Sequence, residues 1–142
     1  MGMVLSRLKE GFGMHIDDAK KYKRYSIIKF TYNQFNCVFG NKIQLKDCYF
    51  TDKAMGYYKL EYLYIPKNYK FIFEHDRGYF TIKLLDSEEA FTYISYIYPE
   101  LKSDLSEPNI RLFIEKLKYH LDKDDLEFYV LKNNQRVKKV GH

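Results

Sequence analysis

The strongest constraint on the fold of this chain is a region of alternating side chains between residues 57 and 84. Residues 57–65 place large apolar side chains at every second position, namely Tyr58, Leu60, Tyr62 and Tyr64. The charged side chains of Lys59 and Glu61 lie at intervening positions, so this strand has one apolar and one partly polar face. Two more strand-like runs follow at residues 69–75 and 79–84, joined by a turn at Gly78. Three strands joined by short turns predict the centre of an antiparallel sheet.

The flanking segments predict further strands. After a short basic helix predicted at residues 19–24, residues 26–32 and 35–39 are rich in β-branched and aromatic side chains, and residues 42–46 alternate between polar and apolar ones. All three segments are predicted as strands. Near the C-terminus, residues 126–131 alternate as a strand. After a turn at Asn133 and Asn134, residues 136–140 are expected to return as an edge strand or to form a loose basic tail.

Two amphipathic helices are predicted after the central strands. The first spans residues 86–98, with Asp86 as its N-cap and Pro99 beyond its end. The second begins at Ser106 and carries an apolar stripe of Ile110, Phe113, Ile114, Leu117 and Leu121. These elements predict an α+β fold, in which two main helices pack on one face of a single antiparallel sheet of five to seven strands. We expect a single domain over residues 1–142, with flexible ends at 1–14 and 133–142.

Charge and composition narrow the classes of partner and compartment. The 142 residues include fifteen Tyr, eleven Phe and no Trp, and the formal net charge is +5. Such a charge predicts an acidic partner, either nucleic acid or an acidic protein. No apolar run approaches the roughly 20 residues needed to span a membrane and no secretion signal is recognisable, so we expect a cytoplasmic protein. Cys37 and Cys48 lack a CxxC spacing and are expected to be reduced core thiols.

The sequence contains no pattern that predicts catalysis, a cofactor or a metal site. Its four histidines, His15, His75, His120 and His142, show no metal-ligand spacing. His75 precedes Asp76 and Arg77 in a segment interpreted as a polar hairpin turn, and His120 suits the C-terminal end of a helix. The motifs of nucleotide-binding loops and serine hydrolases are absent. We therefore assign no catalytic residue, and an enzyme with an unrecognised site is the third alternative.

Nucleic-acid binding is the second alternative, as a basic accessory protein of a phage or mobile element. Two basic runs support it: Lys20, Lys21, Lys23 and Arg24, and then Lys132, Arg136, Lys138 and Lys139. A tyrosine-rich sheet face could also stack bases. Against this hypothesis, acidic residues are interspersed with basic ones along most of the chain, and no known nucleic-acid-binding motif is recognisable.

The segment of residues 56–98, an antiparallel run followed by residues 85–91 and their helix, resembles small immunity proteins of bacterial polymorphic-toxin systems. The likeness extends through the second helix to residues 128–129. It implies a cytosolic antitoxin that occupies the active site of its cognate toxin, or a nearby surface, as a stoichiometric inhibitor. The positive charge of the chain would suit a toxin with an acidic face. Acidic immunity proteins commonly pair with basic nucleases. The positive charge of this chain departs from that pattern and disfavours a nuclease as the target.

A protein-binding inhibitor is the first interpretation, because tyrosine supplies rigid amphipathic area for recognition. We expect partner-binding residues on exposed positions of the central hairpins. The candidates are Tyr57, Lys59, Glu61, Lys70, Glu74 and Arg77.

Overall fold

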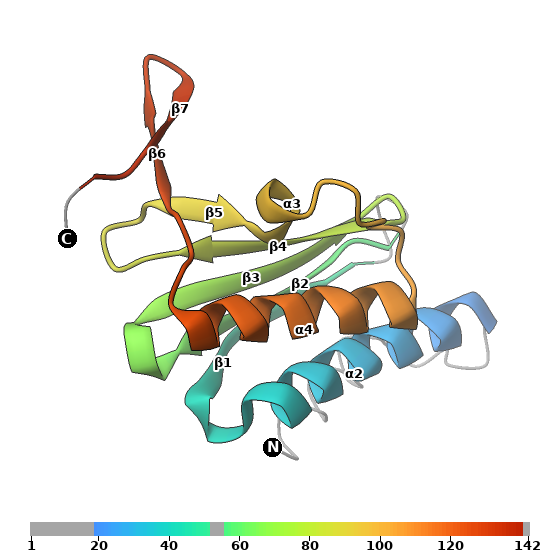
Figure 1. Ribbon diagram of the computed structural model, residues 1–142. Helices are drawn as coiled ribbons and strands as arrows, with labels where there is room; N and C mark the ends of the chain where they lie inside the picture. The colour runs from blue at the N-terminus through green and yellow to red at the C-terminus, as the bar shows by residue number, and fades with distance from the viewer. Residues whose placement is uncertain (1–18, 52–55, 141–142) are drawn as a thin grey trace.

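The computed structural model describes residues 19–51 and 56–140, and it shows an α+β fold with one antiparallel sheet. Two helices of several turns pack on the sheet (Figure 1). The helical elements are α2 (Ala19–Phe39), η1 (Gly40–Lys42), η2 (Ile65–Lys67), α3 (Ile94–Ile97) and α4 (Glu107–Lys123). The strands are β1 (Ile43–Phe50), β2 (Tyr58–Tyr64), β3 (Tyr69–Asp76), β4 (Tyr79–Leu85), β5 (Phe91–Tyr93), β6 (Tyr129–Lys132) and β7 (Gln135–Lys138). The fold class predicted from the sequence is confirmed.

The seven strands lie in the sheet in the order in which they occur in the chain, β1-β2-β3-β4-β5-β6-β7. Each pair of neighbours is antiparallel, and the predicted hairpins β2–β3 and β3–β4 are present. Gly78 has a φ of +86° in the second turn, a value that few residues other than glycine adopt. Of the two outcomes expected for the C-terminal segment, the structure shows the edge strand β7. The predicted flexible end at 1–14 lies outside the described residues.

The segment from residue 26 to residue 39 is helical, so the two strands predicted there are wrong. It belongs to α2, whereas the predicted helix ends at residue 24. The buried side chains on α2 include Ile28, Tyr32, Phe35 and Phe39, a spacing of three or four residues that places them on one helix face. Other apolar residues on α2 are half-buried at its edges, which weakens the helical period. Their β-branched and aromatic character favours strand, and packing on the sheet overrides that preference. Cys37 is exposed on α2, so it is not the core thiol that we expected.

The segment 86–98 is mostly not helical, and the first of the two predicted helices is therefore wrong. It forms the three-residue strand β5 followed by the single turn α3. Asp86 does cap backbone N–H groups, but those of Glu88 and Ala90 in a tight turn, with both distances at 2.9 Å. Glu89 has a φ of +66° in this turn, which breaks the helical path. The two main helices are accordingly α2 and α4.

Helix α4 agrees with its prediction at its N-terminal end and along its buried face. The hydroxyl oxygen of Ser106 accepts a hydrogen bond from the Asn109 N–H at 3.4 Å, and Pro108 lies in the first turn. Every residue of the predicted stripe is buried. Asp124, with a φ of +55°, ends the helix in the left-handed conformation.

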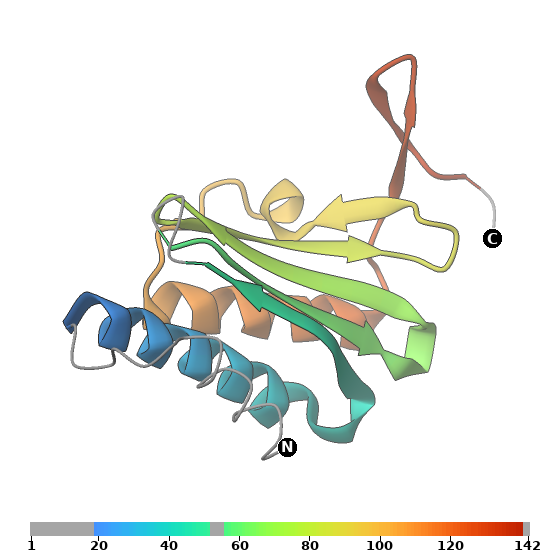
Figure 2. The same ribbon diagram turned by 180° about the vertical axis from the view of Figure 1, so that it is seen from behind.

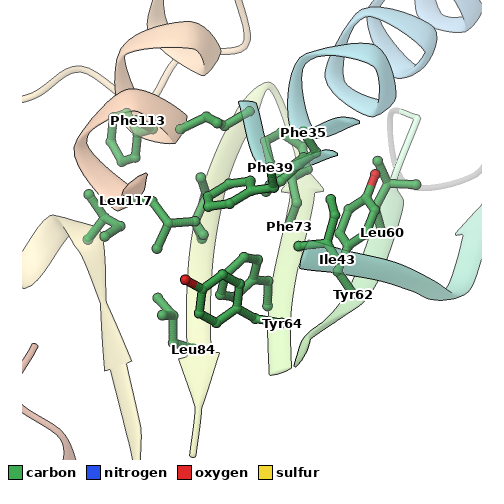
Figure 3. Close-up of a cluster of buried hydrophobic side chains, with 14 of the residues drawn as sticks. Phe35, Phe39, Ile43, Leu60, Tyr62, Tyr64, Phe73, Leu84, Phe113 and Leu117 are labelled. Atoms are coloured by element: carbon green, nitrogen blue, oxygen red, sulfur yellow. The ribbon is translucent and has the colours of Figure 1, made fainter. Parts of the chain in front are cut away.

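The core lies between the sheet and the helix pair, and half of its buried residues are aromatic (Figure 3). The Phe35 ring lies 4.7 Å from the Tyr62 ring and 6.2 Å from the Phe73 ring, measured between centroids. On the α4 side, the Phe113 ring packs edge-on against Phe80 at 4.8 Å. The predicted apolar face of β2 is wholly buried.

No helix among the described residues is long and apolar enough to cross a membrane.

Within this core, the Tyr62 hydroxyl has no hydrogen-bond partner among the described residues. Tyr62 is fully buried, and burial raises its pKa well above the ordinary value. Replacing Tyr62 with phenylalanine is expected to raise the free energy of unfolding by about 1 kcal/mol, because an unsatisfied hydroxyl is removed. Urea denaturation measures the change. The matched variant is Tyr58→Phe, whose lost hydroxyl lies 3.1 Å from the Thr31 hydroxyl, and it should lower the free energy of unfolding by a similar amount. A loss of stability in Tyr62→Phe would contradict the prediction.

Candidate protein-interaction surface

The face of the sheet opposite α2 and α4, here called the outer face, carries side chains in three rows that cross the strands. Helices α2 and α4 lie side by side on the other face (Figures 1 and 2). The first row is Tyr49, Lys59, Glu74 and Thr81. The second is Asp47, Glu61, Ile72, Lys83 and Tyr93. The third is Gln44, Leu63, Lys70, Leu85, Phe91 and then Tyr129 of β6. All of these positions are half-buried or exposed.

The structure brings five of the six residues proposed from the sequence together on this outer face. Tyr57 comes directly before β2, which carries Lys59 and Glu61, and the adjacent β3 carries Lys70 and Glu74. The sixth, Arg77, lies in the β3–β4 turn with a φ of +55° and a side chain that is 77% exposed. Lys70 is also exposed, whereas the other four are half-buried.

The charged groups of the outer face pair across the strands. Lys59 lies 3.9 Å from an Asp47 carboxylate oxygen, and Lys70 lies 3.8 Å from Glu61. Each pair joins a half-buried side chain to an exposed one, and at these separations near solvent it contributes little to stability. The Tyr57 hydroxyl donates a hydrogen bond to Glu74 at 2.6 Å. Burial and this hydrogen bond raise the pKa of Tyr57 to about 12, so its hydroxyl stays protonated and fixed in place.

An aromatic cluster with two cations lies where the outer face meets β6, and sequence analysis missed it. It comprises Phe91, Tyr93, Tyr96 and Tyr129, together with Lys83 and Arg136. The guanidinium of Arg136 lies 3.9 Å from the centre of the Tyr96 ring and 4.9 Å from that of Tyr129. The Lys83 ammonium lies 5.6 Å from the Phe91 ring centre. Phe91 and Tyr93 lie on the same face only in a strand. Because residues 86–98 were predicted as a helix, the sequence analysis did not place these two rings together.

The β6–β7 hairpin projects from the rest of the molecule (Figures 1 and 2). Asn133 and Asn134 both have positive φ, at 53° and 61°, as a two-residue hairpin turn requires. Every residue of β7 is exposed, and the Leu131 side chain of β6 is 65% exposed. Residues 129–140 contain four basic and no acidic side chains. Subtracting these four charges from the net charge of +5 leaves only +1 for the remaining chain, so the positive charge is concentrated on this hairpin.

The base of the hairpin is fastened to the β4–β5 turn. The Lys139 ammonium lies 2.6 Å from a carboxylate oxygen of Asp86 and also contacts Glu88. The backbone N–H of Lys139 donates to the Phe128 carbonyl at 2.7 Å. The Lys139 and Asp86 side chains are only 14% and 6% exposed, which makes this the most buried ion pair in the described part of the chain.

Both described histidines have structural hydrogen bonds. Nδ1 of His75 lies 2.8 Å from the Gly56 carbonyl, and Nε2 accepts from the Gly78 N–H at 3.1 Å, so the buried ring supports the β3–β4 turn. The interpretation of this segment as a hairpin turn agrees with the structure, although His75 itself faces the core. His15 and His142 lie outside the described residues.

His120 forms the arrangement closest to a reactive centre. Its Nδ1 lies 2.7 Å from an Asp125 carboxylate oxygen, and its Nε2 lies 2.7 Å from the Tyr98 hydroxyl. The hydrogen bond from His120 lowers the pKa of Asp125. A hollow of about 330 Å³ lies beside this group and is also lined by Glu127. His120, Asp125 and Glu127 all come from residues 120–127, and Tyr98 comes from the end of α3. The hydrogen bonds of His120 connect the end of α4 to α3 and to the segment that leads into β6, which is a structural role.

Among residues 19–51 and 56–140, no group of three His, Cys, Asp or Glu side chains is placed to hold a metal ion. The side chains of the first basic run, Lys20 to Arg24, lie outside the described part of the chain. Comparisons of the chain with protein-family models, with curated proteins and with solved structures found no match.

Proposed function

We propose that the chain is a non-enzymatic, protein-binding inhibitor of the immunity type, which blocks a cognate toxin with an acidic face by covering its active site or a nearby surface. The observation that carries the proposal is the continuous surface formed by the outer face and the projecting basic hairpin. The third row of the outer face runs without a break from β1 through Phe91 to Tyr129 of the hairpin. Seven strands therefore offer one docking face to a partner.

The composition of this surface fits a protein partner. Half-buried apolar and aromatic side chains alternate with charged ones, as they do in specific protein interfaces. Asp47, Glu61 and Glu74 stand among the lysines of the outer face, where a phosphate backbone would meet carboxylates. An acidic protein surface can instead pair with the basic positions and avoid the acidic ones.

Nucleic-acid binding is the second candidate, and it rests on the aromatic cluster beside Arg136. Aromatic rings next to basic side chains can stack unpaired bases. Steep weakening of binding to single-stranded DNA or RNA with added salt would favour this candidate. A nanomolar complex with the toxin encoded beside the gene for this chain favours the first.

Reversing two charges tests the electrostatic part of the proposal. Lys70→Glu combined with Arg77→Glu is expected to lower the association rate constant with the toxin about five- to tenfold at low salt, because Lys70 is exposed on the outer face and Arg77 is exposed in the β3–β4 turn at its border. Thermal unfolding should be nearly unchanged, since exposed substitutions have small effects. Surface plasmon resonance at several salt concentrations measures the rates.

The control for this double variant carries the same change of charge elsewhere. Lys29→Glu with Lys42→Glu alters exposed positions on α2 and η1, away from the outer face. It should slow association much less. Equal association rates for the two double variants at low salt would remove Lys70 and Arg77 from the interface, whereas the absence of any complex with wild-type protein would refute the proposed function.

A further inference from the structure

Strand β7 forms one edge of the sheet, and among the described residues it pairs with β6 alone. In an antiparallel pair, hydrogen-bonded and non-hydrogen-bonded residue pairs alternate. The bond from the Lys139 N–H to the Phe128 carbonyl identifies that pair as hydrogen-bonded. By alternation, Val130 and Val137 also form a hydrogen-bonded pair, whereas Arg136 and Lys138 do not bond to β6. The N–H and C=O groups of Arg136 and Lys138 therefore point away from the sheet along its free edge.

The same two residues carry basic side chains on the side of the hairpin that continues the outer face. Lys138 is opposite Tyr129 and Arg136 is opposite Leu131. Lys132 adds a third cation near the turn, on the opposite side of the hairpin, and no acidic residue occurs between 129 and 140. The edge thus combines unpaired backbone groups with positive charge.

These charges select the kind of strand that can pair there. A second copy of the chain pairing through β7 would place Arg136 and Lys138 against the same cations, which disfavours the pairing. A strand with acidic side chains at alternate positions would place carboxylates opposite the cations instead. Electrostatic complementarity therefore favours an acidic, extended segment of another protein.

The edge is held in position before any partner arrives. Lys139 fixes the base of the hairpin, just after β7, to Asp86, and Arg136 lies against the Tyr96 and Tyr129 rings. Lys138 lies 3.4 Å from Glu127 in an exposed pair that a partner carboxylate can replace at small cost. An edge that is already extended and anchored loses less conformational entropy on binding.

We propose that the free edge of β7 receives an acidic, extended segment of the toxin as an added strand, through the outward backbone groups of Arg136 and Lys138 and the charges of their side chains. This inference rests on the proposed function and specifies how the partner is recognised. Strand addition draws affinity from main-chain hydrogen bonds and specificity from side chains at alternate positions.

A pair of substitutions at one position separates the backbone contribution from the charge. Lys138→Ala removes the cation and keeps the outward N–H, whereas Lys138→Pro removes both. Since that N–H does not bond to β6, proline leaves the β6–β7 ladder intact, as it does on other edge strands. The probe is a fluorescein-labelled peptide in which glutamate alternates with valine or threonine, and its binding is followed by fluorescence anisotropy.

We expect Lys138→Ala to weaken binding of the peptide about threefold, as loss of one exposed ion pair does. Lys138→Pro should weaken it about tenfold further, because a main-chain hydrogen bond is lost. A peptide with lysine in place of glutamate should not bind. Circular dichroism and thermal unfolding of both variants should match the wild type, which shows that the domain is folded.

Three results would overturn strand addition. The first is equal affinity of Lys138→Ala and Lys138→Pro for the acidic peptide. The second is tighter, strongly salt-dependent binding of oligothymidylate, which points to nucleic acid. The third is a dimer of the chain, seen by light scattering, that Lys138→Pro dissociates. If Lys138→Pro forms the toxin complex normally, strand addition is refuted and the proposed function is not. If the wild-type chain binds the peptide but does not bind the toxin, the proposed function is refuted.

Discussion

Replacing Phe35 with alanine is expected to lower the free energy of unfolding by about 3–5 kcal/mol, which is a large effect for a single substitution. Phe35 is fully buried and joins α2 to the sheet through its contacts with Tyr62, Phe71 and Phe73. Its removal leaves a cavity between rings that are held by neighbouring strands and cannot collapse into the space. Denaturation in guanidinium chloride, fitted with a common slope, measures the change.

The control for Phe35→Ala is Asn33→Ala on the exposed side of α2. Alanine has a higher helix propensity than asparagine, so this variant should be as stable as the wild type or more stable by about 0.5 kcal/mol. Together the two variants test whether residues 26–39 form a helix packed on the sheet. A loss below about 1 kcal/mol in Phe35→Ala, or a large loss in Asn33→Ala, would contradict that arrangement.

Replacing Asp86 with alanine is expected to lower the free energy of unfolding by about 2–3 kcal/mol. The change removes the acceptor for the N–H groups of Glu88 and Ala90 and the buried partner of Lys139. Hydrogen exchange should also become faster in the β6–β7 hairpin, because its base is no longer fastened to the β4–β5 turn. Glu88→Ala is the control: Glu88 also contacts Lys139, but its side chain is 72% exposed and its loss should cost less than about 1 kcal/mol.

The contribution of Asp86 should depend on pH. Burial alone would raise the pKa of Asp86, but hydrogen bonds from Lys139 and from two backbone N–H groups outweigh burial and hold the pKa below its ordinary value of 3.8. The folded state therefore favours the ionised carboxylate. Its stabilisation is fully present above the ordinary pKa, and it is lost progressively as the pH falls below that value and through the lowered pKa of the folded state.

Stability measurements at neutral pH and at about pH 3 test this sign. Wild-type protein should lose more stability on acidification than Asp86→Asn, which cannot ionise at this position. Equal losses in the two proteins would show that the Asp86 carboxylate does not contribute. Hydrogen bonds to Asp86 and Glu88 raise the pKa of Lys139 above its ordinary value of 10.5. Lys139 therefore stays positively charged at both pH values of this experiment.

The elements that sequence analysis predicted well are those specified by local patterns. The alternation in β2 to β4, the turn at Gly78 and the Ser106 cap of α4 each depend on a few adjacent residues. Helix α2 was predicted only over residues 19–24. Its continuation was missed because that part of the sequence is rich in strand-favouring residues, and its helical period appears only when Ile28, Phe35 and the sheet are considered together. Strand β5 was missed because Asp86 has the features of a helix cap and in fact caps a turn.

The same distinction applies to the candidate surface. Alternation in β2 and β3 was enough to place Lys59, Glu61 and Glu74 on the polar face of the sheet. The aromatic cluster around Arg136 depends on pairing between β5 and β6, whose residues Phe91 and Tyr129 are far apart in sequence. The free edge of β7 is likewise a property of strand order, which local sequence patterns do not specify.

The hairpin meets the rest of the sheet through one paired position, Phe91 with Tyr129, and Val130 packs against the buried core near its base. Mutations at its tip can therefore accumulate without disturbing how the domain packs. The exposed side chains of β7 are free to change during evolution, while the requirements for folding remain confined to the interior and to the base of the hairpin.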